Sequence, residues 1–455
     1  MKKIKSLNPF NSEVLKEYDQ LSDEEVLKKL EKTSIAYEDW RESSLQEKSS
    51  FLLNASEYLM EHQGRFAKII SLEMGKPIKE ALAEVEKCSW VCRYYVHHAA
   101  EHLEDVEIET EAQKSYIHYQ PIGGILAVMP WNFPFWQVFR FAAPAVMAGN
   151  VCVLKHASNV PQCSLAIEEV FEKSGFPKGV FQSLLIDNSQ VENIISHRSI
   201  AAVTLTGSEQ AGSIVAGMAG KYIKKSVMEL GGSDPFIVLE DADIDLAVEK
   251  AINSRMINTG QSCIAAKRFI IVKEVYEEFK KKVLERIKSL KVGNQMDEEN
   301  QLGPMARPDL ASELWDQVQK SISKGANAII PGKKPEKGSS VFHPVVLENI
   351  KPGIPAFDEE LFGPVFCLMR VENEEKAISF ANNSAFGLGA SLWTKNKLKA
   401  ATLAAKINSG AVFINEMVKS DPRLPFGGVK KSGYGRELSA LGIREFVNAK
   451  TIWIN

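Results

Sequence analysis

The sequence lacks the long hydrophobic runs and the charge excess that define several classes of protein. It has no stretch of about 18 or more apolar residues, so no transmembrane helix is expected. The basic start, Met1-Lys2-Lys3-Ile4-Lys5, leads directly into polar residues without the apolar segment of a secretory signal. The 55 basic and 58 acidic residues leave a net charge of −3, which gives no reason to expect binding to nucleic acid or to a membrane. We therefore expect a cytoplasmic protein.

Cysteine and histidine are too few and too scattered to predict a disulfide framework or a metal centre. The chain has six cysteines and eight histidines. Cys88 and Cys92 are four residues apart, so they do not form the CxxC pair of a redox or zinc site. His97, His98 and His102 could share one helix face as metal ligands, but a polar helix face is the favoured interpretation. We expect no bound metal.

The 455 residues allow two or three domains, and the pattern of apolar residues predicts an α/β fold. The first hundred residues are predicted to be mostly helical, with helices at 23–35, 45–62 and 78–103 and capping boxes at Ser22 and Ser44. After Gly123, short apolar runs alternate with segments of helical length, as in the βαβ units of a buried parallel sheet. These runs are 124–129, 151–155, 181–186, 201–206 and 225–230.

A second α/β segment is predicted from residue 234 to about residue 418. It begins with the apolar run 234–239, and the strand 268–272 and the helix 275–290 follow. Residues 114–120 and 446–454 also resemble strands. The terminal strand has no local partner, so we expect it to dock on another domain or subunit.

Glycine residues mark a candidate phosphate site, although no GxGxxG fingerprint follows a predicted strand. The strand 201–206 leads into Gly207-Ser208-Glu209-Gln210-Ala211-Gly212. Ser213 and Ile214 stand where a P-loop has lysine and serine or threonine, which excludes triphosphate hydrolysis. A glycine-led turn into a helix N-terminus still favours anion binding. Gly207 and Ser208 are therefore candidates to hold a pyrophosphate.

The candidate nucleophile is Cys263, which ends the stretch Asn258-Thr259-Gly260-Gln261-Ser262-Cys263. A tight turn through these small and polar residues would leave the thiol uncovered, and a thiolate is a strong nucleophile. With an ordinary pKa of about 8.5, only a few per cent of a thiol is ionised at neutral pH, so Cys263 needs a base or a positive charge nearby. Gly260 and Ser262 are interpreted as small residues that let substrate and cofactor approach.

Two polar residues next to predicted strands could assist Cys263. Glu229 ends a strand and precedes Leu230-Gly231-Gly232, which gives a carboxylate room to reach a water. Its alternative interpretation is a solvated acid. Asn132 stands between Pro130 and Pro134, and this rigidity suits either an oxyanion donor or a structural turn.

Six motifs, taken together, resemble the motif series of the aldehyde dehydrogenase superfamily. The resemblance covers the chain from about residue 8 to its end. Within the superfamily, the chain is most similar to bacterial succinate-semialdehyde dehydrogenases, as residues 154–161, 229–235 and 426–437 indicate. The six motifs are Pro130-Trp131-Asn132-Phe133-Pro134, Thr206-Gly207-Ser208, Glu229-Leu230-Gly231-Gly232, Gly260-Gln261-Ser262-Cys263, Glu360-Leu361-Phe362-Gly363-Pro364 and Pro425-Phe426-Gly427-Gly428.

The resemblance implies two Rossmann-like parallel-sheet domains and a small β oligomerisation element. Residues 1–110 and 124–230 would form the cofactor-binding domain, and residues 231–425 the catalytic domain. Residues 111–123 and 440–455 would form the oligomerisation element of a homodimer or homotetramer.

The resemblance also implies NAD(P)-dependent oxidation of an aldehyde to an acid. Cys263 attacks the aldehyde carbon, the Asn132 side chain and the Cys263 N–H stabilise the oxyanion, and hydride transfer to the nicotinamide leaves a thioester. Glu229 activates the water that hydrolyses this thioester. The expected substrate is succinate semialdehyde, with glutarate semialdehyde as an alternative. Relatives that pass the acyl group to CoA or phosphate lack the glutamate, and non-catalytic relatives lose the nucleophile, the base or the cofactor contacts. No signature of a cysteine hydrolase surrounds Cys263.

The implied cofactor contacts are Trp131, Lys155, Ser158, Gly207, Ser208, Leu230, Glu360 and Phe362. Ser158 stands where many relatives have a glutamate that binds the ribose hydroxyls and repels a 2′-phosphate, so we expect NADP to be favoured over NAD. His156 replaces a frequent proline, without a predicted effect on the pocket. For the substrate carboxylate, Arg140 is the first candidate and Ser420 the second. Arg255 is either a further substrate-binding arginine or part of a structural ion pair.

Overall fold

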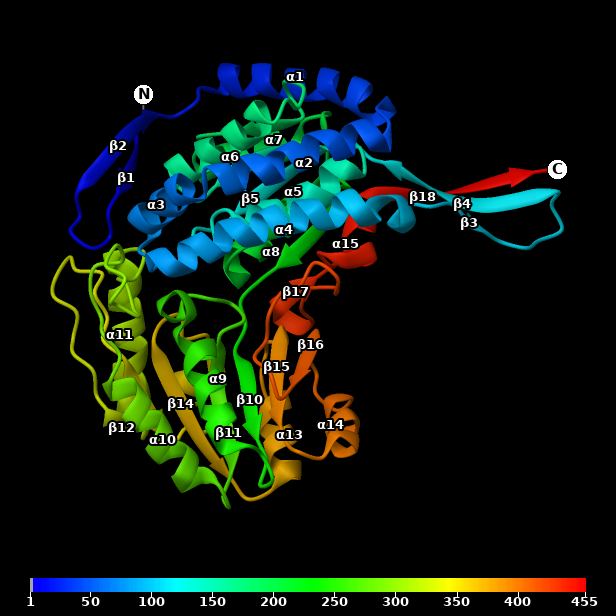
Figure 1. The fold of residues 1–455 in the computed structure, drawn as a ribbon. Coiled ribbons are helices and arrows are strands. Elements are labelled where there is room, and N and C mark those ends of the chain that lie inside the picture. Colours follow the sequence, from blue (N-terminus) through cyan, green and yellow to red (C-terminus); the bar gives the residue numbers. More distant parts are fainter. Residues whose placement is uncertain (1–2) are drawn as a thin grey trace.

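The computed structural model describes residues 3–455, which form two large sheets covered by helices and a smaller sheet that extends away from them (Figure 1). The first large sheet has six strands in the order β17-β9-β8-β5-β6-β7, and the second has seven in the order β12-β13-β14-β11-β10-β15-β16. Neighbouring strands are parallel except in the pairs β17–β9 and β12–β13. The predicted fold of two parallel α/β sheets with a small β element is confirmed.

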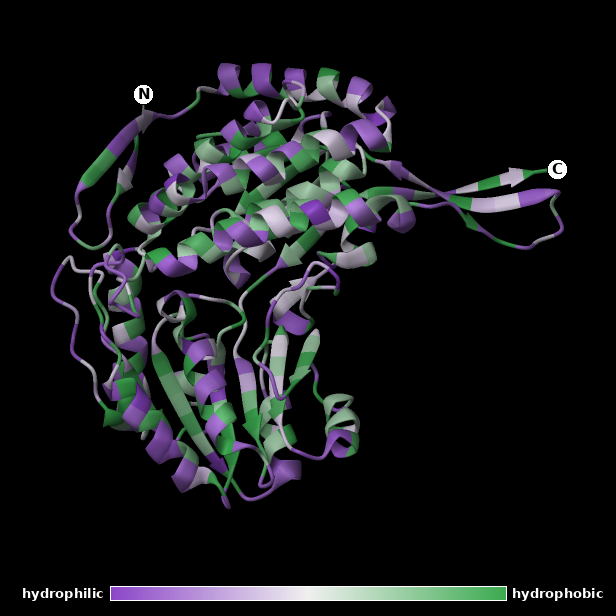
Figure 2. Cartoon of the chain, viewed as in Figure 1, coloured by the Kyte–Doolittle hydropathy of each residue, from purple (hydrophilic) through white to green (hydrophobic). Residues whose placement is uncertain are grey.

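The first sheet is built around β5, which has β6 on one side and β8 on the other. The chain therefore leaves β5 in both directions, and such a switch point forms a crevice at the carboxyl ends of the strands. The central strands are almost continuously apolar and buried, as is typical of a parallel sheet with helices on its faces. Figure 2 shows that the outer helices carry many hydrophilic (purple) residues. The elements are β5 (Gly124–Met129), α5 (Trp136–Met147), β6 (Val151–His156), α6 (Pro161–Lys173), β7 (Phe181–Ser183), α7 (Val191–Ser196), β8 (Ile200–Thr206), α8 (Glu209–Lys221), β9 (Lys225–Glu229) and β17 (Gly433–Tyr434).

The second sheet has its own apolar core, centred on Phe236, Phe269 and Phe366. Its elements are β10 (Asp234–Val238), α9 (Ile244–Met256), β11 (Ala266–Val272), α10 (Tyr276–Lys288), α11 (Pro308–Ser323), β12 (Asn327–Ile330), β13 (Val345–Glu348), α12 (Pro355–Asp358), β14 (Val365–Val371), α13 (Glu374–Asn382), β15 (Gly389–Trp393), α14 (Lys397–Ala404) and β16 (Ala411–Ile414). Residues 258–263, which we call the nucleophile segment, lie between α9 and β11.

The N-terminal region differs from the prediction at its start. A hairpin, β1 (Lys3–Leu7) with β2 (Val14–Asp19), precedes the four helices α1 (Asp23–Glu42), α2 (Leu45–Glu61), α3 (Gln63–Met74) and α4 (Ile78–His102). Both predicted capping boxes are confirmed, at Ser22 and Ser44. Helix α1 continues beyond the predicted end because Trp40 is buried in the core and donates its indole N–H to the carbonyl oxygen of Val146.

The terminal strand β18 (Val447–Ile454) pairs with β4 (Lys114–Pro121) along the full length of both. The short strand β3 (Val106–Glu107) completes this sheet, which projects from the body (Figure 1), and the short helix α15 (Ser439–Arg444) leads into β18. The predicted docking of the terminal strand is therefore satisfied within one chain. Within residues 3–455, no helix combines the length and the hydrophobicity that a membrane crossing requires.

Candidate active site

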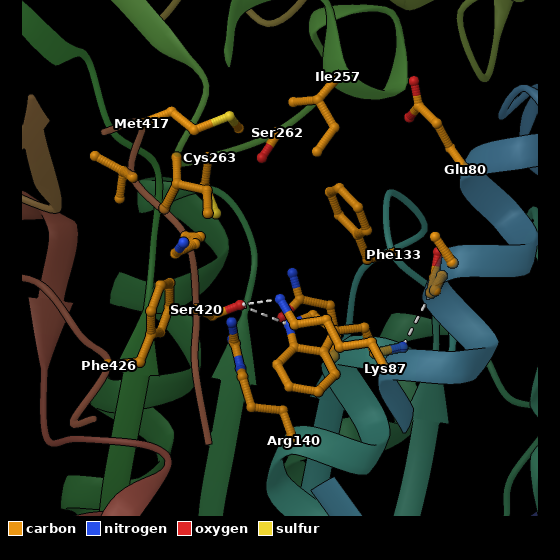
Figure 3. Close-up of a pocket in the computed structure, with 17 residues that line it drawn as sticks. Glu80, Lys87, Phe133, Arg140, Ile257, Ser262, Cys263, Met417, Ser420 and Phe426 are labelled. Carbon is orange, nitrogen blue, oxygen red and sulfur yellow. Dashed lines mark hydrogen bonds between the residues drawn. The ribbon is translucent and has the colours of Figure 1, made fainter. Parts of the chain in front are cut away.

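Cys263 lies on the wall of a cavity of about 190 Å³ (Figure 3). Helices α4 and α5 form one side of the cavity, and the nucleophile segment and the segment 417–420 form the other. The side chain of Cys263 keeps a partly exposed surface. An engineered apolar cavity of ~150 Å³ admits benzene, so this cavity suits a substrate of a few carbon atoms.

The turn before Cys263 is left-handed, as its small and polar residues suggest. Asn258, Thr259 and Gly260 have φ angles of 52°, 55° and 76°. A Cβ on Gly260 would lie 2.4 Å from the carbonyl carbon of Gly363. The interpretation of Gly260 as an opening for substrate or cofactor is therefore wrong, because the glycine is required by the close approach of another backbone. Ser262 does line the cavity.

Arg255 does not line the cavity. Its guanidinium is completely buried behind the turn, where Nη1 donates to Ala266 and Nη2 donates to the carbonyl oxygens of Gly260, Leu361 and Gly363. Burial lowers its pKa to about 10, so it remains a cation at neutral pH. The structure places Arg255 as a clamp on the turn, and this position disagrees with the expectation of a substrate contact.

Lys267 is a site residue that was not predicted from the sequence. Its Nζ donates to the carbonyl oxygens of Ser262 and Cys263, at 2.9 and 2.8 Å, and pairs with Oε1 of Glu360 at 3.1 Å. The same carboxylate accepts a hydrogen bond from the N–H of Gly232. The only sequence signal was a lysine four residues after the nucleophile. Lys267 thus connects the nucleophile segment to a residue expected on the cofactor side.

The Cys263 thiol is protonated at neutral pH in this conformation. Burial raises its pKa to about 12, and the positive charges of Arg140 and Lys267 only partly oppose this effect. The sequence had left the ionisation of this thiol open. The structure therefore requires that a proton leave the sulfur during the reaction.

Asn132 is held against the nucleophile segment. Its Nδ2 donates to the carbonyl oxygen of Gln261 at 3.1 Å, and Asn258 Nδ2 donates to the carbonyl oxygen of Asn132 at 2.7 Å. The residue is 4% exposed and follows β5 at the switch point of the sheet. Because an amide nitrogen has two hydrogens, one remains for an oxygen bound near Cys263.

Glu229 ends β9 and is buried, and within residues 3–455 neither of its carboxylate oxygens has a hydrogen-bond partner. Burial raises its pKa well above the usual range, the charge of Glu437 raises it further, and Arg140 opposes both. Glu437 itself forms a buried ion pair with Arg140. A solvated acid is therefore the wrong interpretation of Glu229. Glu437 was not predicted as a site residue, although it ends the motif at 426–437.

The residues expected to hold a cofactor lie near the carboxyl ends of the first sheet. Lys155 is near the end of β6, and Gly207 and Ser208 join β8 to α8, where Ser208 caps the helix N-terminus. Leu230 directly follows β9 and packs against Gly212 in α8. Gly231 has no space for a side chain, because a Cβ there would lie 2.2 Å from Oε2 of Glu360.

Two aromatic residues and an exposed serine complete this set. The rings of Trp131 and Phe362 meet nearly at right angles, with centroids 5.8 Å apart. Ser158 is exposed after β6. A helix N-terminus, a lysine and a neutral serine fit a dinucleotide that carries an additional phosphate.

His156 connects the segment that follows β5 to the turn that follows β6. Its Nε2 donates to the carbonyl oxygen of Pro134 at 2.9 Å, and its Nδ1 accepts from the N–H of Ala157 at 2.9 Å. Burial lowers its pKa to about 4, so the ring is neutral at physiological pH. His156 therefore ties the segment after β5 to the segment after β6.

The comparisons with known proteins agree with this geometry. The pattern of the aldehyde dehydrogenase family matches residues 1–452. A protein of Synechocystis named as a probable succinate-semialdehyde dehydrogenase (NADP+) is 49% identical over 451 residues, which are 99% of both chains. An Escherichia coli succinate semialdehyde dehydrogenase (NAD(P)+) is 44% identical over 448 residues, 98% of this chain and 97% of the other.

Solved structures show the same likeness. A succinic semialdehyde dehydrogenase from Streptococcus pyogenes in complex with NADP+ superposes with a TM-score of 0.97 at 37% identity, and the match covers 99% of each chain. The chain belongs to the aldehyde dehydrogenase family. It is an enzyme of this family, with a fold that the family shares.

The raised pKa of Cys263 predicts slow alkylation at neutral pH in the absence of cofactor. Because the thiolate is the reactive form, we expect the rate with iodoacetamide to rise about tenfold per pH unit from pH 7 towards pH 10. Mass spectrometry of the peptide containing Cys263 measures the rate, and a Cys263→Ser variant identifies labelling at other cysteines. A rate that reaches a plateau below pH 8 would contradict the expectation.

Proposed function

We propose that this enzyme oxidises succinate semialdehyde to succinate with NADP, through a thioester on Cys263. The observation that carries the proposal is the cavity itself, in which a nucleophile shares a small space with the polar side chains of Arg140 and Ser420. The relatives of 44–49% identity named as succinate-semialdehyde dehydrogenases support this substrate.

The first step is attack of Cys263 Sγ on the aldehyde carbon. The thiol must lose its proton, which passes to solvent through the cavity that Cys263 lines. The carbonyl oxygen becomes an oxyanion, which the free hydrogen of Asn132 Nδ2 and the N–H of Cys263 stabilise. One such donor is typically worth about 10²–10³ in rate.

The second half of the reaction is hydrolysis of the thioester. Glu229, whose carboxylate has no protein hydrogen-bond partner among residues 3–455, takes a proton from a water, and the water oxygen bonds to the acyl carbon. The C–S bond then breaks and the proton passes from Glu229 to the sulfur, which releases the acid and the thiol. Glu229 can perform this step only when it is ionised. Because burial and Glu437 raise its pKa, the ionised fraction and the hydrolysis rate increase with pH.

Lys155, Gly207 and Ser208 are proposed to hold the phosphates of the cofactor, with Trp131, Leu230, Glu360 and Phe362 along its nicotinamide half. When bound, NADP accepts a hydride from the substrate carbon. Ser158 leaves space and no negative charge for a 2′-phosphate, and Lys155 supplies the cation.

Arg140 and Ser420 are proposed to contact the distal carboxylate of the substrate, since both line the cavity with Cys263. Glutarate semialdehyde, which is one carbon longer, is the alternative substrate. The projecting sheet of β3, β4 and β18 is proposed to join subunits in a homodimer or homotetramer. It exposes Trp453 and Ile454 to solvent in the single chain, and buried apolar surface is the main driving force of association. A cytoplasmic location is also proposed.

A matrix of aldehydes against NAD and NADP tests the proposed reaction. We expect the highest kcat/KM for succinate semialdehyde with NADP, and a value at least tenfold lower for butanal, which lacks the carboxylate. Absorbance of the reduced cofactor measures turnover. If no aldehyde is oxidised with either cofactor, or if butanal is the better substrate, the proposal is wrong.

Glu229→Gln is expected to stop turnover after one acylation. The amide cannot take a proton from water, so kcat should fall about 10²–10⁴-fold while Cys263 retains a covalent acyl group. Intact-protein mass spectrometry detects this group, and Asn132→Ala is the contrast because it should slow its formation instead. In the wild type, the hydrolysis rate in single-turnover experiments should increase with pH. Normal turnover by Glu229→Gln would assign the base to another residue.

Ser158→Glu is expected to reverse the cofactor preference. The new carboxylate repels a 2′-phosphate and accepts hydrogen bonds from ribose hydroxyls, so kcat/KM should fall at least tenfold for NADP and rise for NAD. Ser158→Gln, which has a similar shape without the charge, is the control. An unchanged NADP to NAD ratio in Ser158→Glu would place the 2′-phosphate elsewhere.

A further inference from the structure

The cavity contains a third polar side chain, Lys87 of α4, that the proposed function leaves without a role. Figure 3 shows Lys87, Arg140 and Ser420 approaching one another from three different segments. Lys87 Nζ donates to Ser420 Oγ at 2.8 Å and lies 4.3 Å from the centroid of the Trp136 ring. The ring supports the aliphatic stem and directs the ammonium group towards the cavity.

The charge of Lys87 is not balanced by an acid. Within the described chain, residues 3–455, no carboxylate forms an ion pair with this ammonium group, and the nearby acids are engaged elsewhere. Glu84 accepts hydrogen bonds from the N–H groups of Phe135 and Trp136 and pairs with Lys76. Asp421 pairs with Arg423, at 2.7 Å.

Arg140 differs from Lys87 in this respect. Its guanidinium forms an ion pair with the buried Glu437 and stacks on the ring of Phe426, with its central carbon 4.5 Å from the ring centroid. The pair of Arg140 and Glu437 is neutral overall. It can donate hydrogen bonds to a ligand, but it does not give the cavity a net positive charge.

Ser420 is oriented by the same arrangement. Its Oγ accepts hydrogen bonds from Lys87 Nζ at 2.8 Å and from Trp136 Nε1 at 3.1 Å. A hydroxyl oxygen has two lone pairs, so both are in use and the hydroxyl hydrogen must point to a third group. Lys87 has two further N–H groups. The two residues therefore present several donors and no free acceptor.

We propose that Lys87 is the residue that selects substrates with a carboxylate distal to the aldehyde, and that it binds this carboxylate together with Ser420. The inference rests on the proposed function and names the cation of that site. Arg140 contributes hydrogen bonds, and through Glu437 its main electrostatic effect is on Glu229.

The ionisation of Lys87 agrees with this role. Burial lowers its pKa to about 8, and the charge of Arg140 lowers it further, while Cys88, Asp421 and Glu84 oppose both. The amine is therefore mostly protonated at neutral pH. A bound carboxylate would stabilise the charged form, because an opposite charge within a few ångströms favours ionisation.

Lys87→Met tests the proposal, because methionine keeps an apolar stem over Trp136 and removes the charge. The quantity to measure is the ratio of kcat/KM for succinate semialdehyde to that for butanal. We expect this ratio to fall about 10- to 100-fold in Lys87→Met, in line with the loss of charged hydrogen bonds. Lys87→Arg should retain most of it.

Lys419→Met is the matched control. Lys419 also lines the cavity, but its ammonium group is more exposed and pairs with Glu416, so the ratio should change less than twofold. A second readout is inhibition of butanal turnover by succinate, which should weaken by a similar factor in Lys87→Met. If Lys87→Met does not fold, as judged by its unfolding temperature and its NADP binding, Lys87→Gln replaces it.

The outcomes separate the two proposals. If the wild type shows no preference for succinate semialdehyde over butanal, the proposed substrate is wrong. If the wild type has the preference and both charge-removing variants of Lys87 retain it, the role of Lys87 is wrong. If the ratio of kcat/KM for succinate semialdehyde to that for butanal falls in Arg140→Lys but is unchanged in Lys87→Met, Arg140 is the cation that selects the substrate.

Discussion

The site depends on one buried constraint, which is the clamp of cations on the carbonyl oxygens of the nucleophile segment. Arg255 binds the turn from behind, and Lys267 binds the carbonyl oxygens of Ser262 and Cys263 themselves. Backbone carbonyl oxygens carry only partial negative charge, so these contacts stabilise a buried cation less than a carboxylate would. The arrangement makes the carbonyl groups point away from the cavity, and Cys263 is left on the open side.

Charge in the rest of the site is distributed in pairs that nearly cancel. Arg140 balances Glu437, Lys267 balances Glu360, and Glu229 is buried with its pKa raised. A buried pair that is neutral overall costs less desolvation than an isolated ion, and it perturbs its neighbours less. Within residues 3–455, Lys87 at the cavity wall forms no ion pair with an acid, and its ammonium group is the feature that we propose as the source of a preference for anions.

The sequence predicted much of the fold because buried parallel strands and capped helices depend on local pattern. The five parallel strands of the first sheet and the capping boxes at Ser22 and Ser44 were predicted from local sequence pattern, whereas the antiparallel strand β17 was not. The motifs also pointed to Asn132, whose side chain lies against the segment before Cys263, and to Glu229, which ends β9. The hairpin at residues 3–19 was missed, since its residues carry no strict alternation, and the end of α1 was missed because the contact of Trp40 with Val146 is tertiary.

Side-chain roles were harder to predict than positions. Arg255 and Lys87 are both basic residues in helical patterns, and the sequence does not show which one faces a cavity and which one faces carbonyl groups. Their roles follow from burial and from partners distant in the chain, such as Gly363 for Arg255 and Ser420 for Lys87. Glu437 was missed for the same reason, because its partner Arg140 lies on α5.

The position of Glu229 has a consequence for the order in which the enzyme becomes active. Its strand β9 pairs with β17, Gly427 packs against its carboxylate, and Glu437 sets its charge environment. All three belong to the last thirty or so residues of the chain, and β18 follows them directly. During synthesis, the chain can therefore form the crevice and expose the Cys263 thiol before residues 427–437 pack around Glu229. Catalytic competence therefore depends on residues 427–437, which come late in the order of synthesis and directly precede the helix and strand that complete the projecting sheet.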